Sequence, residues 1–205
     1  MRAPLQSRSQ ETLNRIVRAA ETLLSERAWD SIPFRELIAE AGVSVGSFYA
    51  RFDDKEALLD HLDDLYVAEV KAMINDVALK IARAKNLKTA STTLVTSIHK
   101  LYSNKKGATR ALVMRARYGH AGASERTNAM TGAAPAILDA FEIHKKEIVH
   151  SAWRSAVGEA AAVAFHAIRE QLLFPQSLAL PISESRTLTL VNRLFYLHLT
   201  TRENQ

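Results

Sequence analysis

The 205-residue sequence predicts an all-α fold of about nine helices. Apolar residues recur at steps of three and four along most of the chain, which is the spacing of a helix with one buried face. No segment shows the alternation of apolar and polar residues that is typical of a half-buried strand. Glycine, proline and asparagine interrupt the helical pattern at intervals that suit the loops of a helical bundle.

The N-terminal region predicts three helices in close succession. A helix over Thr12–Ser25 is followed by a second over Pro33–Glu40, which Gly42 ends because glycine adopts a left-handed helix stop without steric cost. Ser44 is placed to cap a third helix over Val45–Phe52. Only about three residues separate the second helix from the third, and this outline is that of a helix-turn-helix.

Six further helices are expected after residue 53. Asp53 or Asp54 is placed to cap a fourth, longer helix, whose apolar positions run from Leu58 to Ile81. The other five are expected, in chain order, over Leu94–Tyr102, Arg110–Tyr118, Ala134–Trp153, Glu159–Phe174 and Glu184–Thr201. The breaks between them are expected at Asn86, Asn104–Gly107, Gly119–Gly122, Gly158 and Pro175–Pro181.

Composition excludes several classes of site. The chain has no cysteine, which excludes a disulfide framework, a cysteine nucleophile and a Cys-ligated metal. The longest hydrophobic run has six residues, far below the roughly 20 that a membrane-spanning helix needs, and no signal peptide is recognisable. We therefore expect a cytoplasmic protein with no membrane partner.

The net charge of +5 is concentrated in the middle of the chain. Residues 83–120 hold nine basic and no acidic residues, whereas residues 1–55 are neutral overall. The acid-free segment over residues 77–124 has two interpretations, and the sequence leaves both open. It forms a solvated basic face, or it binds an anion or adds attraction to DNA through Arg110, Arg115, Arg117 or the Lys105–Lys106 pair.

A DNA-recognition motif lies between Phe34 and Leu62, where the sequence reads FRELIAEAGVSVGSFYARFDDKEALLDHL. This segment resembles the DNA-binding signature of the TetR family of bacterial transcriptional regulators, whose pattern is close to IAxxAGVSxGxxYxxFxxKExLL. The matching positions are Leu37, Ala41–Ser44, Gly46, Tyr49, Phe52, Lys55–Glu56 and Leu58–Leu59. The resemblance is strong over about residues 10–62, and the remainder matches only as a series of helices.

The residue types of the third helix suit a reader of the major groove. Small or polar residues at its N-terminal end let the backbone and side chains approach base edges and phosphates. Tyr49 adds a phenol that can reach a phosphate, and Lys55 can clamp the DNA backbone. The resemblance implies that Arg35 contacts a base or a phosphate, with Arg51 as a further phosphate contact. The predicted DNA-binding residues are Arg35, Ser44, Val45, Gly46, Ser47, Tyr49, Arg51 and Lys55.

Dimerisation follows from the geometry of DNA. Two recognition helices must enter successive major grooves about 34–36 Å apart, so we expect a homodimer on a pseudo-palindromic operator. Small and apolar residues of the last two helices are the expected interface: Val163, Ala164, Ala167, Ile168, Leu172, Val191, Leu194 and Leu197.

The resemblance further implies a repressor that a small-molecule inducer releases from DNA. In the family, the small molecule enters the C-terminal domain and a shift of the fourth helix changes the separation of the two recognition helices. The basic segment suggests an anionic inducer, whose identity the sequence does not give. Aromatic residues at helical spacing usually belong to the core, but they can also line a pocket. The candidates for the ligand pocket are His99, Tyr102, Arg115, Tyr118, Phe141 and Trp153.

The expected organisation is a flexible tail over residues 1–10, a helix-turn-helix domain over residues 11–53, and a ligand-binding and dimerisation domain over residues 54–205. Two other functions remain open. One is an architectural or cell-division DNA-binding factor that uses the same head without an inducer. The other is a ligand carrier or enzyme built on a helical bundle whose head no longer binds DNA.

Two motifs for catalysis or metal binding are weak. Residues 42–46 read G-x-S-x-G, but a nucleophile elbow needs a strand before the serine, and here a helix precedes it. Glu147 and His150 form a single E-x-x-H pair, whereas a di-iron bundle needs two such pairs and two more glutamates. We expect no enzyme activity, no catalytic residue, no metal ligand and no cofactor.

Overall fold

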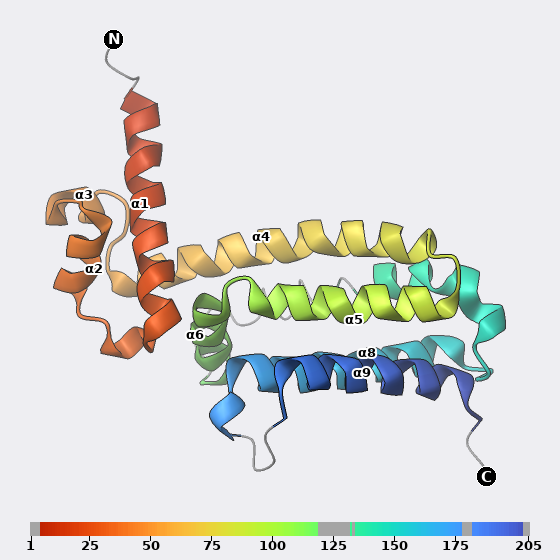
Figure 1. Cartoon of the computed structure of the whole chain (residues 1–205). Helices are drawn as coiled ribbons and strands as arrows, with labels where there is room; N and C mark the ends of the chain where they lie inside the picture. Colours follow the sequence, from red (N-terminus) through yellow and green to blue (C-terminus); the bar gives the residue numbers. More distant parts are fainter. Residues whose placement is uncertain (1–4, 119–131, 133, 178–181, 203–205) are drawn as a thin grey trace. The chain divides into compact units, whose positions relative to one another are not determined.

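The computed structural model describes residues 5–118, 132, 134–177 and 182–202 (Figure 1). All regular structure in these residues is helical, which confirms the predicted fold class. The chain divides into two compact units. The first contains residues 1–66 and 105–123, and the second contains residues 67–104 and 124–205. In the described part of the chain, no helix is long and apolar enough to cross a membrane.

The first unit is built around α1, which packs against α2 and α6. Its core includes Ile16, Leu24, Leu37, Phe48 and Leu58, all of which are fully buried. Burial of one such side chain contributes roughly 1.5–3 kcal/mol. The elements of this unit are α1 (Leu5–Glu26), the 3-10 turn η1 (Trp29–Ser31), α2 (Phe34–Ala41), α3 (Val45–Tyr49), the start of α4 (Lys55–Ala82) and α6 (Lys106–Arg117).

The helix ends of the first unit follow the predicted capping residues. Gly42 ends α2 in the left-handed conformation, with φ of +59°. The Ser44 hydroxyl accepts a hydrogen bond from the Ser47 amide at 3.1 Å and so caps α3. Asp54, one of the two candidates for the cap of α4, accepts from the Ala57 amide at 2.7 Å. Helix α3 is shorter than predicted, because its helical residues end at Tyr49.

Helix α1 begins at Leu5, well before the predicted start at Thr12. Residues 5–10, which were expected to form a flexible tail, are therefore helical, and residues 1–4 lie outside the described part. Side chains bond along this end of the helix: the Thr12 hydroxyl donates to the Arg8 carbonyl at 3.0 Å, and the Gln10 amide donates to Asn14 Oδ1 at 3.1 Å.

Helices α5, α8 and α9 pack side by side in the second unit (Figure 1). Their shared core includes Val95, Tyr102, Phe141, Ile168 and Leu199. The elements of this unit are the remainder of α4, α5 (Leu87–Ser103), a helical segment over residues 134–140, the 3-10 turn η2 (Glu142–Glu147), α8 (Trp153–Leu173), the 3-10 turn η3 (Pro175–Ser177) and α9 (Glu184–Thr200).

The predicted single helix over Ala134–Trp153 is wrong, because η2 and an extended segment interrupt it. Tertiary hydrogen bonds replace the helical pattern there. The Val149 amide donates to the Leu199 carbonyl at 3.0 Å, and His144 Nε2 lies 3.1 Å from the Ile81 carbonyl oxygen. Hydrogen bonds to the C-terminal ends of α4 and α9 therefore hold residues 141–152 in a conformation that the apolar spacing alone does not indicate.

Two glycines that were expected to break helices lie inside them. Gly158 is part of α8, where an added Cβ would meet no atom within 4 Å. Gly107 is part of α6, where a Cβ would lie only 2.0 Å from the Leu24 carbonyl oxygen and 2.6 Å from the Ser25 nitrogen. Glycine is therefore required at position 107 because α6 approaches the backbone of α1 closely. The expected break over residues 119–122 lies outside the described residues.

Candidate nucleic-acid interface

Helix α3 has one buried face and one exposed face. Phe48 is fully buried, with its ring centroid 5.0 Å from that of Phe34. On the other side, the side chains of Val45 and Tyr49 are 51% and 53% exposed. Gly46 lies between them, and an added Cβ there would meet no atom within 4 Å. The short helix therefore presents a small apolar group, a stretch of open backbone and a phenol to the solvent.

Polar groups surround the exposed face of α3. The hydroxyls of Ser44 and Ser47 lie 2.8 Å apart at the N-terminal end of the helix. Arg35 on α2 is exposed and makes no hydrogen bond or ion pair with a described residue. Its guanidinium therefore remains available to a partner.

Arg51 is engaged within the protein. Its Nη1 donates to the Ser47 carbonyl at 2.7 Å, and its Nη2 lies 3.1 Å from the Ser9 carbonyl oxygen and 3.2 Å from the Ser9 hydroxyl. The guanidinium thus joins the end of α3 to the N-terminal part of α1. These bonds do not support the predicted phosphate contact by Arg51.

Lys55 is also engaged within the protein. Its ammonium donates to the carbonyls of Trp29 and Ile32 at 2.6 and 2.7 Å, and it lies 4.4 Å from the centroid of the Trp29 ring. Burial lowers the pKa of Lys55, and the neighbouring Glu56 carboxylate opposes that shift. The ammonium fastens the loop after α1 to the start of α4, so the geometry does not support the predicted clamp on the DNA backbone.

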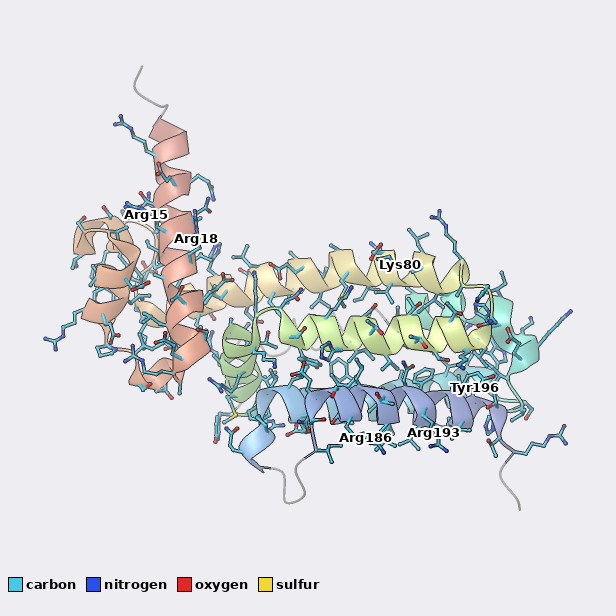
Figure 2. All side chains as sticks on the ribbon, in the orientation of Figure 1. Arg15, Arg18, Lys80, Arg186, Arg193 and Tyr196 are labelled. Atoms are coloured by element: carbon cyan, nitrogen blue, oxygen red, sulfur yellow. The ribbon has the colours of Figure 1, made fainter. Side chains whose placement is uncertain are left out.

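The sequence did not indicate three further contacts that hold the helix-turn-helix. Arg15 on α1 donates to the Gly42 carbonyl at 3.0 Å, and Figure 2 labels it on that helix. The Trp29 indole donates to Glu56 at 2.8 Å. Arg27 and Glu36 form an ion pair with two hydrogen bonds, which lowers the pKa of the Glu36 carboxyl. Two of these contacts join residues 27 apart in sequence and the third joins residues nine apart, and no motif marks any of them.

The residues predicted to bind a ligand do not lie in one unit. His99, Tyr102, Phe141 and Trp153 belong to the second unit, whereas Arg115 and Tyr118 belong to the first. Phe141 and Tyr102 are buried in the core, and the Tyr102 ring lies 5.2 Å from that of Phe165. His99 Nε2 lies 2.7 Å from a carboxylate oxygen of Glu184 on α9.

The basic segment is partly neutralised by acidic residues of the first unit. Lys105 lies 3.0 Å from a carboxylate oxygen of Glu21, and Arg115 Nη1 lies 2.6 Å from one of Asp60. The Arg115 side chain is only 12% exposed. Lys105 and Arg115 therefore have internal partners, and this favours a structural role for these two residues over anion binding.

The predicted interface residues of α8 and α9 divide into an exposed and a buried set. Val163, Leu194 and Leu197 are 63%, 50% and 41% exposed. Ala164, Ile168, Leu172 and Val191 are buried in their own unit. Ala167 is half-buried. The exposed set and Ala167 line an apolar groove of about 650 Å³ between the two helices. Ala164 and Val191 also line this groove, whereas Ile168 and Leu172 do not.

The isolated E-x-x-H pair makes structural contacts. Both carboxylate oxygens of Glu147 accept from the Leu87 amide, at 3.0 and 3.1 Å, at the start of α5. His150 Nε2 lies 2.6 Å from the His198 carbonyl oxygen. Among the described residues, no group of three or more His, Asp or Glu could hold a metal ion.

Comparisons with known proteins identify the same N-terminal segment. Residues 16–62 match the family described as bacterial regulatory proteins, tetR family. No curated protein sequence matches the chain.

Several solved structures share the fold. A bacterial regulatory protein in the tetR family from Rhodococcus RHA1 has a TM-score of 0.68 and 15% identity, covering 94% of this chain and 98% of its own. The transcriptional regulator FadR from Bacillus subtilis, in complex with stearoyl-CoA, has a TM-score of 0.64 and 15% identity, covering 92% and 98%. The fatty acid degradation regulator FadR from Bacillus halodurans has a TM-score of 0.62 and 13% identity, covering 100% of both chains.

Proposed function

We propose that the chain is a repressor of transcription. The proposal rests on the match of residues 16–62 to the tetR family and on the TetR-like fold of the chain. The chain binds a pseudo-palindromic operator as a homodimer, and a small molecule bound in the C-terminal domain releases it. The observation that carries this proposal is the exposed face of α3, where Val45, Gly46 and Tyr49 lie opposite the buried Phe48.

The proposed docking places α3 in the major groove. Gly46 leaves the backbone open to close approach, and Val45 offers an apolar contact to a thymine methyl group. The hydroxyls of Ser47 and Tyr49 donate to phosphate oxygens, and Arg35 contacts a base edge or a phosphate. Because residues 1–55 are neutral overall, we expect few neutralised phosphates per subunit and a shallow dependence of affinity on salt.

The proposed dimer forms through the groove between α8 and α9. Exposed apolar side chains from both helices line it, including Val163, Leu190 and Leu194. Contiguous apolar surface of this kind is typical of protein interfaces, and a two-fold dimer uses the same patch on both copies. The occupant is a second copy of this chain, because a single α3 of five residues reads too few bases for a specific site.

The proposed inducer binds in the second unit. Stearoyl-CoA, which is bound to the Bacillus subtilis FadR structure, is the first compound to test, since it is both anionic and apolar. An inducer acts only if it binds two states of the protein with different affinity, and each 1.4 kcal/mol of difference changes their ratio about tenfold. Helix α4 provides a route, because its residues belong to both units.

Selection of genomic DNA fragments with the purified protein tests this function. We expect an inverted repeat to be enriched and bound with a modest salt slope, and we expect stearoyl-CoA to weaken that binding. Tyr49→Phe should weaken binding to any DNA, whereas Arg35→Ala should also relax the sequence preference. Weak binding without sequence preference would contradict the repressor and favour an architectural factor.

A further inference from the structure

Arg51 connects α3 to α1 through three hydrogen bonds. Its Nη1 donates to the Ser47 carbonyl, while its Nη2 reaches both the carbonyl and the hydroxyl of Ser9 on α1. Its Nε is buried and has no hydrogen-bond partner among the described residues. The Nε edge of the guanidinium is therefore buried, and both Nη atoms form hydrogen bonds within the protein.

The bond to Ser47 acts on the part of α3 that faces the groove. Ser47 lies in the last turn of this short helix, where backbone carbonyls lack helical partners, and an arginine side chain commonly satisfies them. Arg51 ties that carbonyl to α1, which itself packs against α2. The orientation of Ser47 and of its neighbours in α3 thus depends on the contact between Arg51 and Ser9.

We propose that Arg51 is a positioning residue of the DNA reader, which sets the orientation of α3 through Ser9 and does not bind a phosphate. This inference rests on the proposed function. A positioning role needs the planar fork of a guanidinium, whereas a phosphate contact needs mainly positive charge. The two roles therefore respond differently to the replacement of arginine by lysine.

The test compares Arg51→Lys and Arg51→Ala with the unsubstituted 205-residue chain on a selected operator and on unrelated DNA. We expect both variants to bind the operator about tenfold more weakly, to bind unrelated DNA within about twofold of the wild type, and to keep the salt slope. Arg18→Ala is the matched control, because Arg18 is an exposed arginine of α1 that bonds within its own helix. It should leave the preference for the operator unchanged.

Three results would overturn the proposal. In the first, Arg51→Lys keeps its operator affinity and Arg51→Ala loses it. The salt slope of operator binding by the Arg51→Ala dimer is also reduced by about two, as expected when one phosphate contact per subunit is lost. The second is an equal loss on both DNAs together with a lower melting temperature, which shows a general loss of stability. The third is Arg51→Lys and Arg51→Ala both binding like the wild type.

Amide hydrogen exchange in the free protein tests the same contact without DNA. We expect faster exchange in α3 for Arg51→Lys, and a smaller increase for Ser9→Ala, which removes the hydroxyl acceptor but leaves the carbonyl. Unchanged exchange in both variants would overturn the proposal. If the wild type bound no operator, the proposed function would fail, while the exchange result would still decide whether Arg51 holds α3.

Discussion

The exposed face of α3 and the exposed face of α8 and α9 both place apolar side chains in solvent, but they are built differently. Around Val45 and Tyr49 the surface includes serine hydroxyls and an open glycine backbone. Around Leu194 the surface is a continuous apolar groove. The first suits a hydrated, charged partner such as DNA, and the second suits another apolar protein surface.

The two faces also differ in what lies beneath them. Charged side chains bonded to backbone carbonyls hold the helices of the helix-turn-helix, as in Arg15 with Gly42 and Lys55 with Trp29. Apolar side chains such as Ile168 lie beneath the groove. A five-residue helix buries too little apolar surface to fix its own orientation, so polar ties supply what packing cannot. We therefore expect conservative substitutions in the helix-turn-helix to change the orientation of its helices more than the amount of buried apolar surface.

The largest expected effect comes from a charge placed in the groove. Leu194→Glu should raise the dimer dissociation constant at least about 100-fold, since each copy would bury a carboxylate in a groove lined mostly by apolar side chains. Sedimentation equilibrium measures this directly. Thr189→Glu is the matched control, because Thr189 is exposed on α9 and does not line the groove. A dimer of unchanged affinity in Leu194→Glu would show that the copies meet elsewhere.

The next effect tests how tightly the first unit is packed. Gly107→Ala should lower the free energy of unfolding by about 1–3 kcal/mol, because the new Cβ would overlap the Leu24 carbonyl. Gly158→Ala places the same methyl group in open space and should be neutral or stabilising by about 0.5–1 kcal/mol. Urea denaturation compares the two variants. Equal stability of both would contradict the close approach of α6 to α1.

A third substitution separates stability from recognition. Gly46→Val adds a side chain whose Cβ would meet no other atom within 4 Å, so the melting temperature should change little. Operator affinity should fall about tenfold or more, because the added side chain stands between α3 and the bases. Ala68→Val, an exposed position on α4, serves as control in the same binding titration. If operator affinity survived Gly46→Val, this part of α3 would not face the groove.

The smallest effect concerns acid stability. Arg27 lowers the pKa of Glu36 through hydrogen bonds, so the folded state favours the ionised carboxylate. That contribution is present above the ordinary pKa of glutamate and is lost as pH falls through the lowered value in the folded state. Glu36→Gln should therefore reduce the loss of stability between about pH 6 and pH 3 in urea titrations. The exposed Glu40→Gln is the control, and the same loss in all three proteins would contradict this role.

The sequence predicted helices well where one face is buried against neighbours. Val45 and Tyr49, which the family resemblance assigned to DNA binding, are exposed, and Phe48 on the same helix is buried. Apolar spacing failed over residues 134–153, because hydrogen bonds to distant helices decide the local shape there.

Site residues were harder to predict than helices. A basic residue type indicated DNA contacts for Arg51 and Lys55, but carbonyls brought close by the fold take up both cations. Gly107 appeared to mark a turn, since only the folded chain shows the backbone of α1 against it. The sequence does not indicate which distant segments lie together. That arrangement determines whether a basic residue or a glycine contacts a partner or another part of the same chain.

The close approach of α6 to α1 has a consequence for protein engineering. Leu112 on α6 is buried, and α6 packs against α1 although it lies in the second half of the sequence. A head transplanted onto another scaffold as residues 1–66 would leave the α1 surface under Gly107 uncovered. The portable DNA-reading module of this protein is therefore discontinuous, and a working chimaera must carry residues 105–117 together with the helix-turn-helix.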